Sequence, residues 1–451
     1  MNEELELLFD DIRQLLSERR YAQLYQRIRV LQPADIALLF EEIPMEDVIL
    51  TFRLLPKDTA AETFVELEPD RQQMLITAFS DAELKAVLDE LYLDDTVDII
   101  EEMPANVVRR IIRYSTPEMR QSINEILNFP TDSAGSIMTI EYVDLKADMT
   151  IDEAFEHIRA TGWDKETIYT CYVIDTDRHL DGVVTVQQML LCDRHRTIGD
   201  IMDRNVISCR TGDDKVAVAQ TLNKYDFLAL PVVDNESRLV GIVTIDDAID
   251  VLTEDATEDM EMMAAITPLE TTYLRTGILA TWKQRIPWLL LLMLSSTFTQ
   301  KIITSAEDAL SACVALTAFI PMLMGTGGNA GGQVSVTVIR GLSLDEITFS
   351  DWIRVLWKEV RVSLLCGVTL AAANFLKLLV FDRVTLSVAA VVSITLVTVV
   401  VIAKIVGCLL PIAAKRVGFD PAVMASPFIT TIVDALALLT YFQCAKILLG
   451  I

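Results

Sequence analysis

Five long apolar runs dominate the sequence after residue 285, and they constrain the fold more than any other feature. As a helix rising about 1.5 Å per residue, each run can cross the roughly 30 Å hydrocarbon core of a bilayer. A helix also satisfies its own backbone hydrogen bonds in lipid, which an open loop cannot do. The predicted spans are residues 286–303, 309–339, 362–381, 384–414 and 423–449.

Charge divides the chain at the same place. Residues 282–451 contain 13 Lys and Arg and 9 Asp and Glu, out of 38 and 65 in the whole chain, so the first 281 residues carry a net charge of −31. Such an acidic region does not bind nucleic acid, whose phosphates need cations, but it attracts metal cations. The acidic start is not typical of a signal peptide, and the seven dispersed cysteines predict reduced thiols.

Residues 1–130 repeat a short helical unit at spacings near twelve. The stretches "ADIALLFEEIP", "EDVILTFRLLP" and "DDTVDIIEEMP" have apolar residues at helical period and end in Pro. One such helix cannot bury its apolar face alone, whereas stacked neighbours can. This region is therefore predicted to be an acidic α-solenoid.

Residues 131–252 contain a second repeat, 131–197 and 198–252. Each copy reads strand, helix, strand, turn, strand, helix, and the glycine-led "GVVTV" and "GIVTI" end matching strands. The pair resembles tandem CBS domains, which implies a regulatory module that takes an adenine nucleotide. The resemblance places the nucleotide contacts at Thr244 and Asp247. In the first copy the residue three positions after Thr185 is Gln188, where the second copy has Asp247 three positions after Thr244, so one expected acidic contact is missing.

Residues 253–283 are predicted to form a charged helix connecting the acidic half to a membrane domain at 284–451. Eight Lys and Arg flank the spans on one side and four on the other, which predicts that the N-terminus lies in the cytoplasm. Five spans then place the C-terminus outside.

Charged residues inside the predicted spans are costly and usually functional. The two that stand out, because they lie far from the ends of their spans, are Asp434 in the last span and Lys404 in the fourth, at similar predicted depth. Lys404 either pairs with Asp434 or repels a dication, and both alternatives stay open. Two polar stripes predict a wet path, namely Asn329, Gln333 and Thr337 on the second span, and Ser426, Thr430, Asp434 and Tyr441 on the fifth. For the first stripe, hydrogen bonds that hold two helices together are the alternative.

The stretch "GTGGNAGGQ", residues 325–333, packs five glycines into the second span. Glycine lets helix backbones approach closely and leaves carbonyls accessible. Close packing without a pore is the alternative. A phosphate loop is excluded because no Lys-Ser or Lys-Thr follows.

The order solenoid, CBS pair, acidic connecting helix and five spans resembles the MgtE family of bacterial magnesium channels. The specific stretches are "DSAGSIMT" at 132–139, "GTGGNAGGQ", and "DPAVMASPFITTIVD" at 420–434. The resemblance implies a homodimer in the inner membrane that imports Mg²⁺, with no enzymatic activity. It implies that Asp434 faces the ion path, with Asn329, Gly325 and Gly328 beside it.

The same resemblance implies that Mg²⁺ also regulates the channel, by bridging acidic faces of the cytosolic domains and holding the pore shut. The candidate sensor residues are Glu62, Asp94, Asp95, Asp98, Asp214, Asp226, Asp247, Asp250, Asp255, Glu258 and Asp259. An ion-coupled carrier of Mg²⁺, Co²⁺ or Mn²⁺ regulated by CBS domains remains the alternative. The predicted fold class is a multidomain integral membrane protein with an all-α superhelical N domain, an α/β CBS pair and five transmembrane helices.

Overall fold

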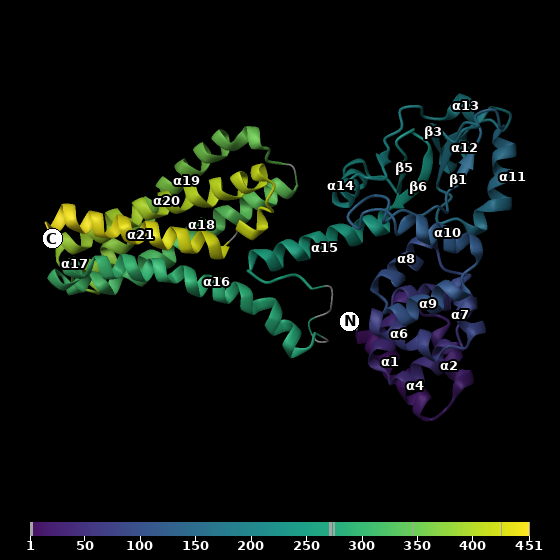
Figure 1. The fold of residues 1–451 in the computed structure, drawn as a ribbon, viewed down its shortest axis with the longest axis horizontal. Helices are drawn as coiled ribbons and strands as arrows, with labels where there is room; N and C mark the ends of the chain where they lie inside the picture. The colour runs from purple at the N-terminus through teal and green to yellow at the C-terminus, as the bar shows by residue number, and fades with distance from the viewer. Residues whose placement is uncertain (1–2, 270–272, 274–275, 345, 425, 451) are drawn as a thin grey trace. The chain divides into compact units, whose positions relative to one another are not determined.

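The chain folds into two compact units, Met1–Thr253 and Glu254–Ile451 (Figure 1). The computed structural model describes residues 3–450 except 270–272, 274–275, 345 and 425. The first unit holds short helices followed by two α/β repeats, and the second holds long apolar helices. This arrangement confirms the predicted fold class.

Short helices form the start of the first unit, and proline marks where many of them begin. Pro33, Pro69 and Pro117 are the first residues of their helices, where a missing N–H costs no hydrogen bond. The prolines that end the three stretches quoted from the sequence, Pro44, Pro56 and Pro104, each lie at the N-cap position just before the next helix. The helices are α1 (Glu3–Ser17), α2 (Tyr21–Ile28), α3 (Pro33–Glu42), α4 (Met45–Phe52), α5 (Lys57–Val65), α6 (Pro69–Ala78), α7 (Asp81–Leu88), α8 (Leu93–Glu102), α9 (Ala105–Tyr114) and α10 (Pro117–Ile126).

The twelve-residue spacing builds an aromatic core between these helices. Phe40, Phe52 and Phe64 recur at that spacing and are at most 5% exposed. Phe52 meets Phe79 with ring centroids 5.2 Å apart, and it meets Phe64 edge to face at 6.3 Å. Such contacts stabilise a core beyond the area that they bury. The repeat therefore places one ring from each of α3, α4 and α5 against the ring of the next helix in this series.

Each α/β repeat contributes a three-stranded sheet. The first has the order β1 (Val143–Leu145), β2 (Thr170–Ile174), β3 (Leu180–Thr185), and the second β4 (Cys209–Arg210), β5 (Ala229–Val233), β6 (Leu239–Thr244). In both sheets the first pairing is parallel and the second antiparallel. The helices of this part are α11 (Ile151–Thr161), the 3-10 helix η1 (Gly162–Asp164), α12 (Val186–Leu191), α13 (Ile198–Ile201), α14 (Lys215–Tyr225) and α15 (Ile245–Met263).

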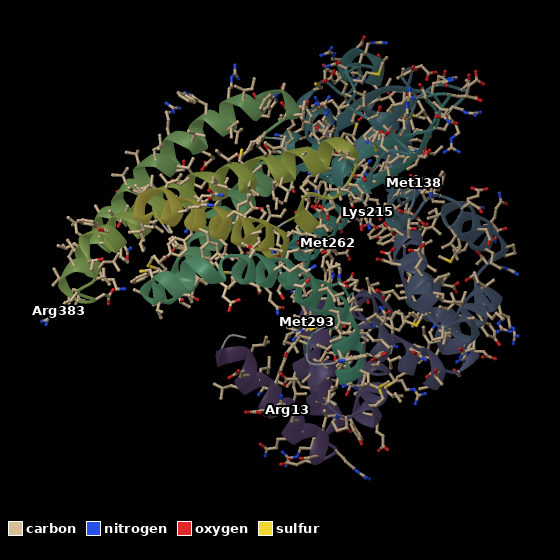
Figure 2. All side chains as sticks on the ribbon, turned by 60° about the vertical axis from the view of Figure 1, so that its left-hand side comes forward. Arg13, Met138, Lys215, Met262, Met293 and Arg383 are labelled. Atoms are coloured by element: carbon tan, nitrogen blue, oxygen red, sulfur yellow. The ribbon has the colours of Figure 1, made fainter. Side chains whose placement is uncertain are left out.

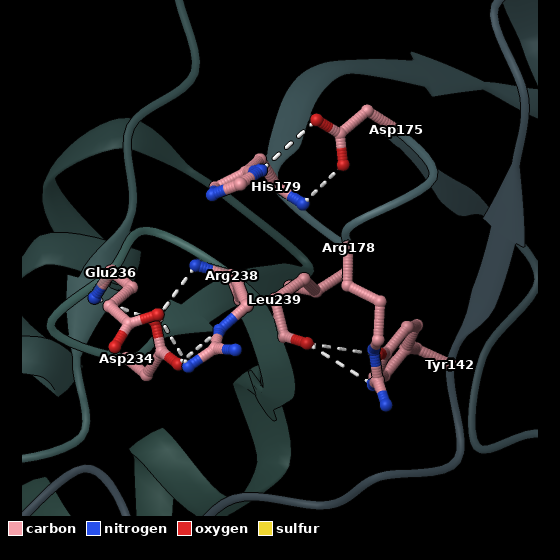
Figure 3. Close-up of polar contacts among 8 residues, drawn as sticks. All are labelled: Tyr142, Asp175, Arg178, His179, Asp234, Glu236, Arg238 and Leu239. Carbon is pink, nitrogen blue, oxygen red and sulfur yellow. Dashed lines mark hydrogen bonds and ion pairs between the residues drawn. The ribbon is translucent and has the colours of Figure 1, made fainter.

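The two repeats are joined through their hairpins (Figure 3). Arg178 Nη2 donates to the hydroxyl of Tyr142 at 2.7 Å and to the carbonyl of Leu239 at 3.2 Å. The rings of Tyr142 and Tyr172 pack edge to face beside residues of the second sheet. The repeats therefore share one core and act as a single module.

The second unit is a bundle of long helices. They are α16 (Ile278–Ser305), α18 (Ile320–Ser343), α19 (Trp352–Val380), α20 (Leu386–Val417) and α21 (Ser426–Leu449), with the short helices α17 (Glu307–Ala312), η2 (Val314–Phe319), η3 (Phe349–Asp351) and η4 (Ala422–Met424) between them. Among the described residues, four helical stretches have the length and apolar composition of a membrane span: Ile278–Ser305, Phe349–Val380, Leu386–Val417 and Pro427–Leu449. Arg383 lies at an end of the bundle, between α19 and α20 (Figure 2).

Two predicted boundaries were wrong. The second span was expected at 309–339, but its continuous helix begins only at Ile320, after α17 and η2. At 24 residues α18 is still roughly 36 Å long, although its glycines and polar residues make it less apolar than the other four. The connecting helix expected at 253–283 is the later half of α15, which ends at Met263, and α16 begins at Ile278.

The glycines of α18 serve helix packing. A Cβ built on Gly407 of α20 would lie 2.3 Å from the carbonyl oxygen of Gly331, so no larger residue fits at this crossing. Gly328 packs against the side chain of Thr430 on α21 in the same way. Small residues are what allow such close approach in a membrane bundle. The alternative of close packing thus describes these two positions.

Candidate functional site

A group of carboxylates surrounds the start of α8 in the first unit. Asp94, Asp95 and Asp98 follow the N-cap residue Tyr92, and Asp94 is only 7% exposed. Asp247, from the first turn of α15, is the charged residue that contributes most to the pKa of each of the three. The structure therefore brings together a solenoid face and a face of the α/β module that are about 150 residues apart in sequence.

Three further carboxylates belong to this acidic cluster, and the sequence analysis missed them. They are Glu141, Glu166 and Asp246 of the α/β module. The charges of Glu141 and Asp246 raise the pKa of Asp95, and Glu166 and the α8 carboxyls raise each other's pKa values. One oxygen of Glu166, Oε2, is buried and has no hydrogen-bond partner within the described residues. No sequence motif marks these residues, because their place depends on how the repeats pack. We define the acidic cluster as Asp94, Asp95, Asp98, Glu141, Glu166, Asp246 and Asp247.

Burial and like charge both raise pKa values in the acidic cluster. Burial, with the charges of Asp247 and Asp246, raises the pKa of Asp95 to about 7. Burial, with the charges of Asp246 and Asp95, raises the pKa of Glu166 to about 8. The pKa of Asp94 is raised by burial and then by Asp247. Asp98 lies at the solvent-exposed edge of the cluster, and its pKa is raised by burial of the carboxyl and by the charge of Asp247. Such a cluster is suited to a divalent cation.

The acidic cluster is more open than a direct metal site. Within the described part of the chain, one group of His, Cys, Asp or Glu has its ligand atoms within 4.8 Å of one another: Asp175, Asp177 and His179. There Asp175 Oδ1 accepts the N–H groups of Asp177 and His179, and Oδ2 lies 3.0 Å from His179 Nδ1. An open cluster matches a cation that keeps its water shell, as Mg²⁺ does.

The matching hairpin of the second repeat explains the group at Asp175 without a metal (Figure 3). Asp234 Oδ1 accepts the N–H groups of Glu236 and Arg238, and Oδ2 accepts from Arg238 Nε at 2.9 Å. A guanidinium thus stands where the imidazole stands in the first repeat. A carboxylate that caps its own turn in both hairpins is a structural feature.

Asp247 has a second partner that bears on the predicted nucleotide contact. Thr244 Oγ1 donates to Asp247 Oδ2 at 2.6 Å, which fixes this carboxylate at the start of α15. In the first repeat, Gln188 occupies the matching place and caps α12 instead. Its side chain accepts from the N–H of Thr185 at 2.8 Å, and Thr185 Oγ1 accepts in return. The two repeats therefore offer different groups at this position.

The other predicted sensor residues of the first unit are spread more widely. Asp214 caps α14 by accepting from the N–H of Ala217, and Asp226 follows the same helix in the left-handed conformation with φ of 54°. Asp250 is exposed on α15, and burial and Asp246 raise its pKa. Glu62 contributes its charge to the pKa of Tyr92, beside the acidic cluster. Asp214 and Asp226 thus lie at opposite ends of α14.

A second acidic site lies in the other unit, where the end of α15 meets the end of α18. Ser343 Oγ donates to Asp259 Oδ2 at 3.1 Å, and Met262 and Met263 pack against Ile339. Burial raises the pKa of Asp259, and the charges of Asp255 and Asp420 add to this effect. Asp420 was missing from the predicted set, whereas the predicted Glu258 is exposed.

The membrane carboxylate Asp434 is half-buried on α21, one turn beyond Thr430. Its Oδ1 is buried and has no hydrogen-bond partner among the described residues. On α18, Gly325, Asn329 and Gln333 lie on an exposed face of this single chain, and nothing lies within 4 Å of a Cβ built on Gly325. We call this the polar face of α18. Gly328 does not belong to it, because it packs on Thr430.

One of the two alternatives for Lys404, pairing with Asp434, was wrong, and so was the expectation for Tyr441. Lys404 pairs with Glu359 of α19, with Nζ 3.6 Å from Oε2, and Asp434 is not its partner in the described structure. Tyr441, expected on a wet path, is fully buried and donates its hydroxyl proton to the carbonyl of Leu316 at 2.9 Å. The side chain of Ser426 lies outside the described residues.

The raised pKa values predict how stability depends on pH. A carboxyl whose folded pKa is raised contributes stability that is complete below its ordinary pKa near 4 and is lost as pH rises through the folded value. Without divalent cations, the melting temperature should therefore fall by roughly 5 °C or more between pH 5.5 and 8.5, and Mg²⁺ should restore more of it at pH 8.5 than at pH 6. Thermal unfolding of the full-length protein in EDTA and in Mg²⁺ measures both effects.

The variant Asp95→Asn/Glu166→Gln is the control for this prediction. Its melting temperature should depend less on pH, because Asp95 and Glu166, whose pKa values are raised to about 7 and about 8, no longer titrate. A melting temperature in EDTA that stays level or rises over this range would contradict the prediction.

An acidic sensor-like cluster, a two-repeat regulatory module and a bundle of apolar helices containing a carboxylate define a regulated membrane transport protein. Family models agree with each part. They match "MgtE intracellular N domain" at 31–132, "CBS domain" at 134–192 and 198–254, and "Divalent cation transporter" at 320–444.

Whole-chain relatives give the family. The magnesium transporter MgtE of Thermus thermophilus is 36% identical over 448 residues, covering 98% of this chain and 99% of its own. The magnesium transporter MgtE of Bacillus subtilis is 31% identical, covering 96% of this chain and 95% of its own. The cytosolic domain of the Mg²⁺ channel MgtE in complex with ATP superposes with a TM-score of 0.52 at 34% identity, covering 54% of this chain and 99% of that structure. The chain belongs to the MgtE family of magnesium transporters.

Proposed function

We propose that this protein is a homodimeric channel that admits Mg²⁺ down its electrochemical gradient and is closed by cytosolic Mg²⁺. The polar face of α18 carries the proposal. Asn329 and Gln333 are exposed in a single chain, and in the proposed bundle they would lie at membrane depth. Polar side chains at that depth face protein or water rather than lipid. A second copy placed against this face would enclose a wet path, which Asp434 would line.

The ion path would suit a hydrated cation. Mg²⁺ gives up its waters reluctantly, so a wide path with carboxylates and amide oxygens touching water fits it best. Asp434 and Asn329 supply these groups, and Gly325 leaves room beside them. The names of the relatives, which are magnesium transporters, support the choice of ion.

Regulation would act through the two acidic sites. Without a cation the acidic cluster repels itself, and Mg²⁺ would bridge Asp94, Asp98 and Asp247 and draw the helical domain onto the α/β module. Asp255, Asp259 and Asp420 would hold a second cation near the end of α18. Because α15 carries both Asp247 and Asp259, cation binding would also fix this helix. Asp214, Asp226, Asp250, Glu258 and Glu62 remain proposed sensor residues.

An adenine nucleotide is the proposed second ligand of the α/β module, at Thr244 and Asp247. A solved MgtE cytosolic domain is described as a complex with ATP, which supports this proposal. Asp247 would then serve both ligands. The proposed location is the bacterial inner membrane, with the N-terminus and the soluble domains in the cytoplasm and the C-terminus outside.

Mg²⁺ flux into liposomes tests the function. Purified full-length protein should pass Mg²⁺ along a gradient, and flux should fall when the side of the soluble domains holds millimolar Mg²⁺. Single-channel currents separate a channel from the alternative, a carrier coupled to another ion, because alternating access gives no unitary conductance. Liposomes without protein provide the baseline, and flux equal to that baseline would contradict the proposal.

A further inference from the structure

The five long helices of the second unit contain two carboxylates, Glu359 on α19 and Asp434 on α21. Both lie about two turns from the nearest end of their helix, and their surroundings differ. Asp434 has a buried oxygen without a partner in the described structure. Glu359 faces the ammonium group of Lys404, and the side chains of Lys404 and Glu359 are only 8% and 16% exposed. The bundle therefore compensates the charge of one carboxylate and not of the other.

The seam between α19 and α20 places Lys404 against Glu359. The two helices run antiparallel, and they also meet where a Cβ built on Gly367 would lie 3.2 Å from the Cα of Val397. Gly367 is about two turns beyond Glu359, and Val397 about two turns before Lys404, so one register accounts for both contacts. The ion pair is thus a fixed feature of the packing.

The chemistry of an unpaired Glu359 would be that of a cation site. A buried carboxylate without a counter-charge is costly, and it either takes a proton or binds a cation. Carboxylate oxygens are the ligands that Mg²⁺ prefers. An unpaired Glu359 inside a Mg²⁺-transporting bundle would therefore compete with Asp434 for the ion.

We propose that Lys404 is a tethered counter-cation that occupies Glu359 and so keeps this second membrane carboxylate from holding the transported cation. This assigns Lys404 a role in specificity, through Glu359, and rests on the proposed function of Asp434. It also explains why a cation is tolerated in the middle of an apolar helix, because Glu359 neutralises the charge of Lys404.

Binding of Mn²⁺ to full-length protein tests the proposal without measuring transport. In a background of Asp434→Asn, the added change Lys404→Gln should create about one further Mn²⁺ site per chain, and adding Glu359→Gln should remove it. The exchanged pair Glu359→Lys/Lys404→Glu should bind no further Mn²⁺. The matched control is Lys377→Gln. It frees Asp382, which lies in the turn after α19 with Oδ2 3.1 Å from Nζ of the half-exposed Lys377, and it should create no site because water screens that charge.

Flux provides the second measurement. With Asp434 intact, Lys404→Gln should lower the half-saturating Mg²⁺ concentration at least about threefold. It should also slow maximal flux, since a trapped ion leaves slowly. In Glu359→Gln/Lys404→Gln both quantities should return to within about twofold of their wild-type values. The proposal is overturned if Lys404→Gln gains no Mn²⁺ site, if the exchanged pair gains one, or if the double variant stays as impaired as Lys404→Gln. An extra Mn²⁺ site in a protein that passes no Mg²⁺ would support the pair and reject the proposed function.

Discussion

Replacing Asp434 by Asn should reduce Mg²⁺ uptake at least about 100-fold while the protein still assembles. A divalent cation about 5 Å from a carboxylate gains roughly 6 kcal/mol at an effective dielectric constant near 20, and every 1.4 kcal/mol is tenfold. The side chain is half-buried, so water screens it less than it screens a surface carboxylate. Flux into liposomes, with size-exclusion chromatography of the same preparation, measures uptake and assembly together.

Two variants control for this result. Asp434→Glu keeps the charge and should retain a measurable part of the flux. Asp382→Asn removes a carboxylate of the same unit that lies outside the helices, in the turn after α19, and should leave flux unchanged. Uptake by Asp434→Asn at the wild-type rate would remove Asp434 from the ion path.

The combined change Asp94→Asn/Asp98→Asn/Asp247→Asn should abolish the closing response to Mg²⁺. The charge of Asp247 raises the pKa of Asp94 and of Asp98 on α8, so these three side chains belong to the two faces that a cation would bridge. The variant should keep conducting at millimolar internal Mg²⁺, where wild-type flux has fallen about tenfold or more. A fall of that size requires Mg²⁺ to bind the closed state about tenfold or more tightly than the open state. Protection of the soluble half from protease should then no longer rise with Mg²⁺.

A charge-matched control separates a site effect from net charge. Asp89, Glu90 and Glu156 are exposed carboxylates outside the acidic cluster, and neutralising all three should preserve closure. Each single change within the cluster should shift the Mg²⁺ midpoint only modestly. A triple variant that is protected and closed without Mg²⁺ would mean that relief of repulsion alone closes the protein, and bridging by the ion would be rejected.

The order of the domains was readable from sequence because the signals are local. Helical period, glycine-led strand ends and long apolar runs each depend on neighbouring residues, so the solenoid, the α/β pair and the membrane helices were predicted correctly as a class. The acidic residues of α8 and the membrane carboxylate Asp434 stood out for the same reason. The start of α18 was misplaced because apolar composition continues through the short helices α17 and η2 that precede it. The end of α15 was misplaced because the predicted connecting helix was extended up to the first apolar run.

Composition and local pattern were enough to show which charged groups this protein has to accommodate: a surplus of carboxylates in one half, and in the other a few charges that lipid does not tolerate. The partners of these groups followed from helix packing. Lys404 was expected near Asp434 from depth alone, yet it pairs with Glu359, and Glu141, Glu166 and Asp246 join the acidic cluster without any motif. Depth along a helix follows from counting residues. The direction in which a side chain points depends on helix rotation, and the contact between Gly331 and Gly407 sets that rotation across a distance in sequence that no local pattern spans.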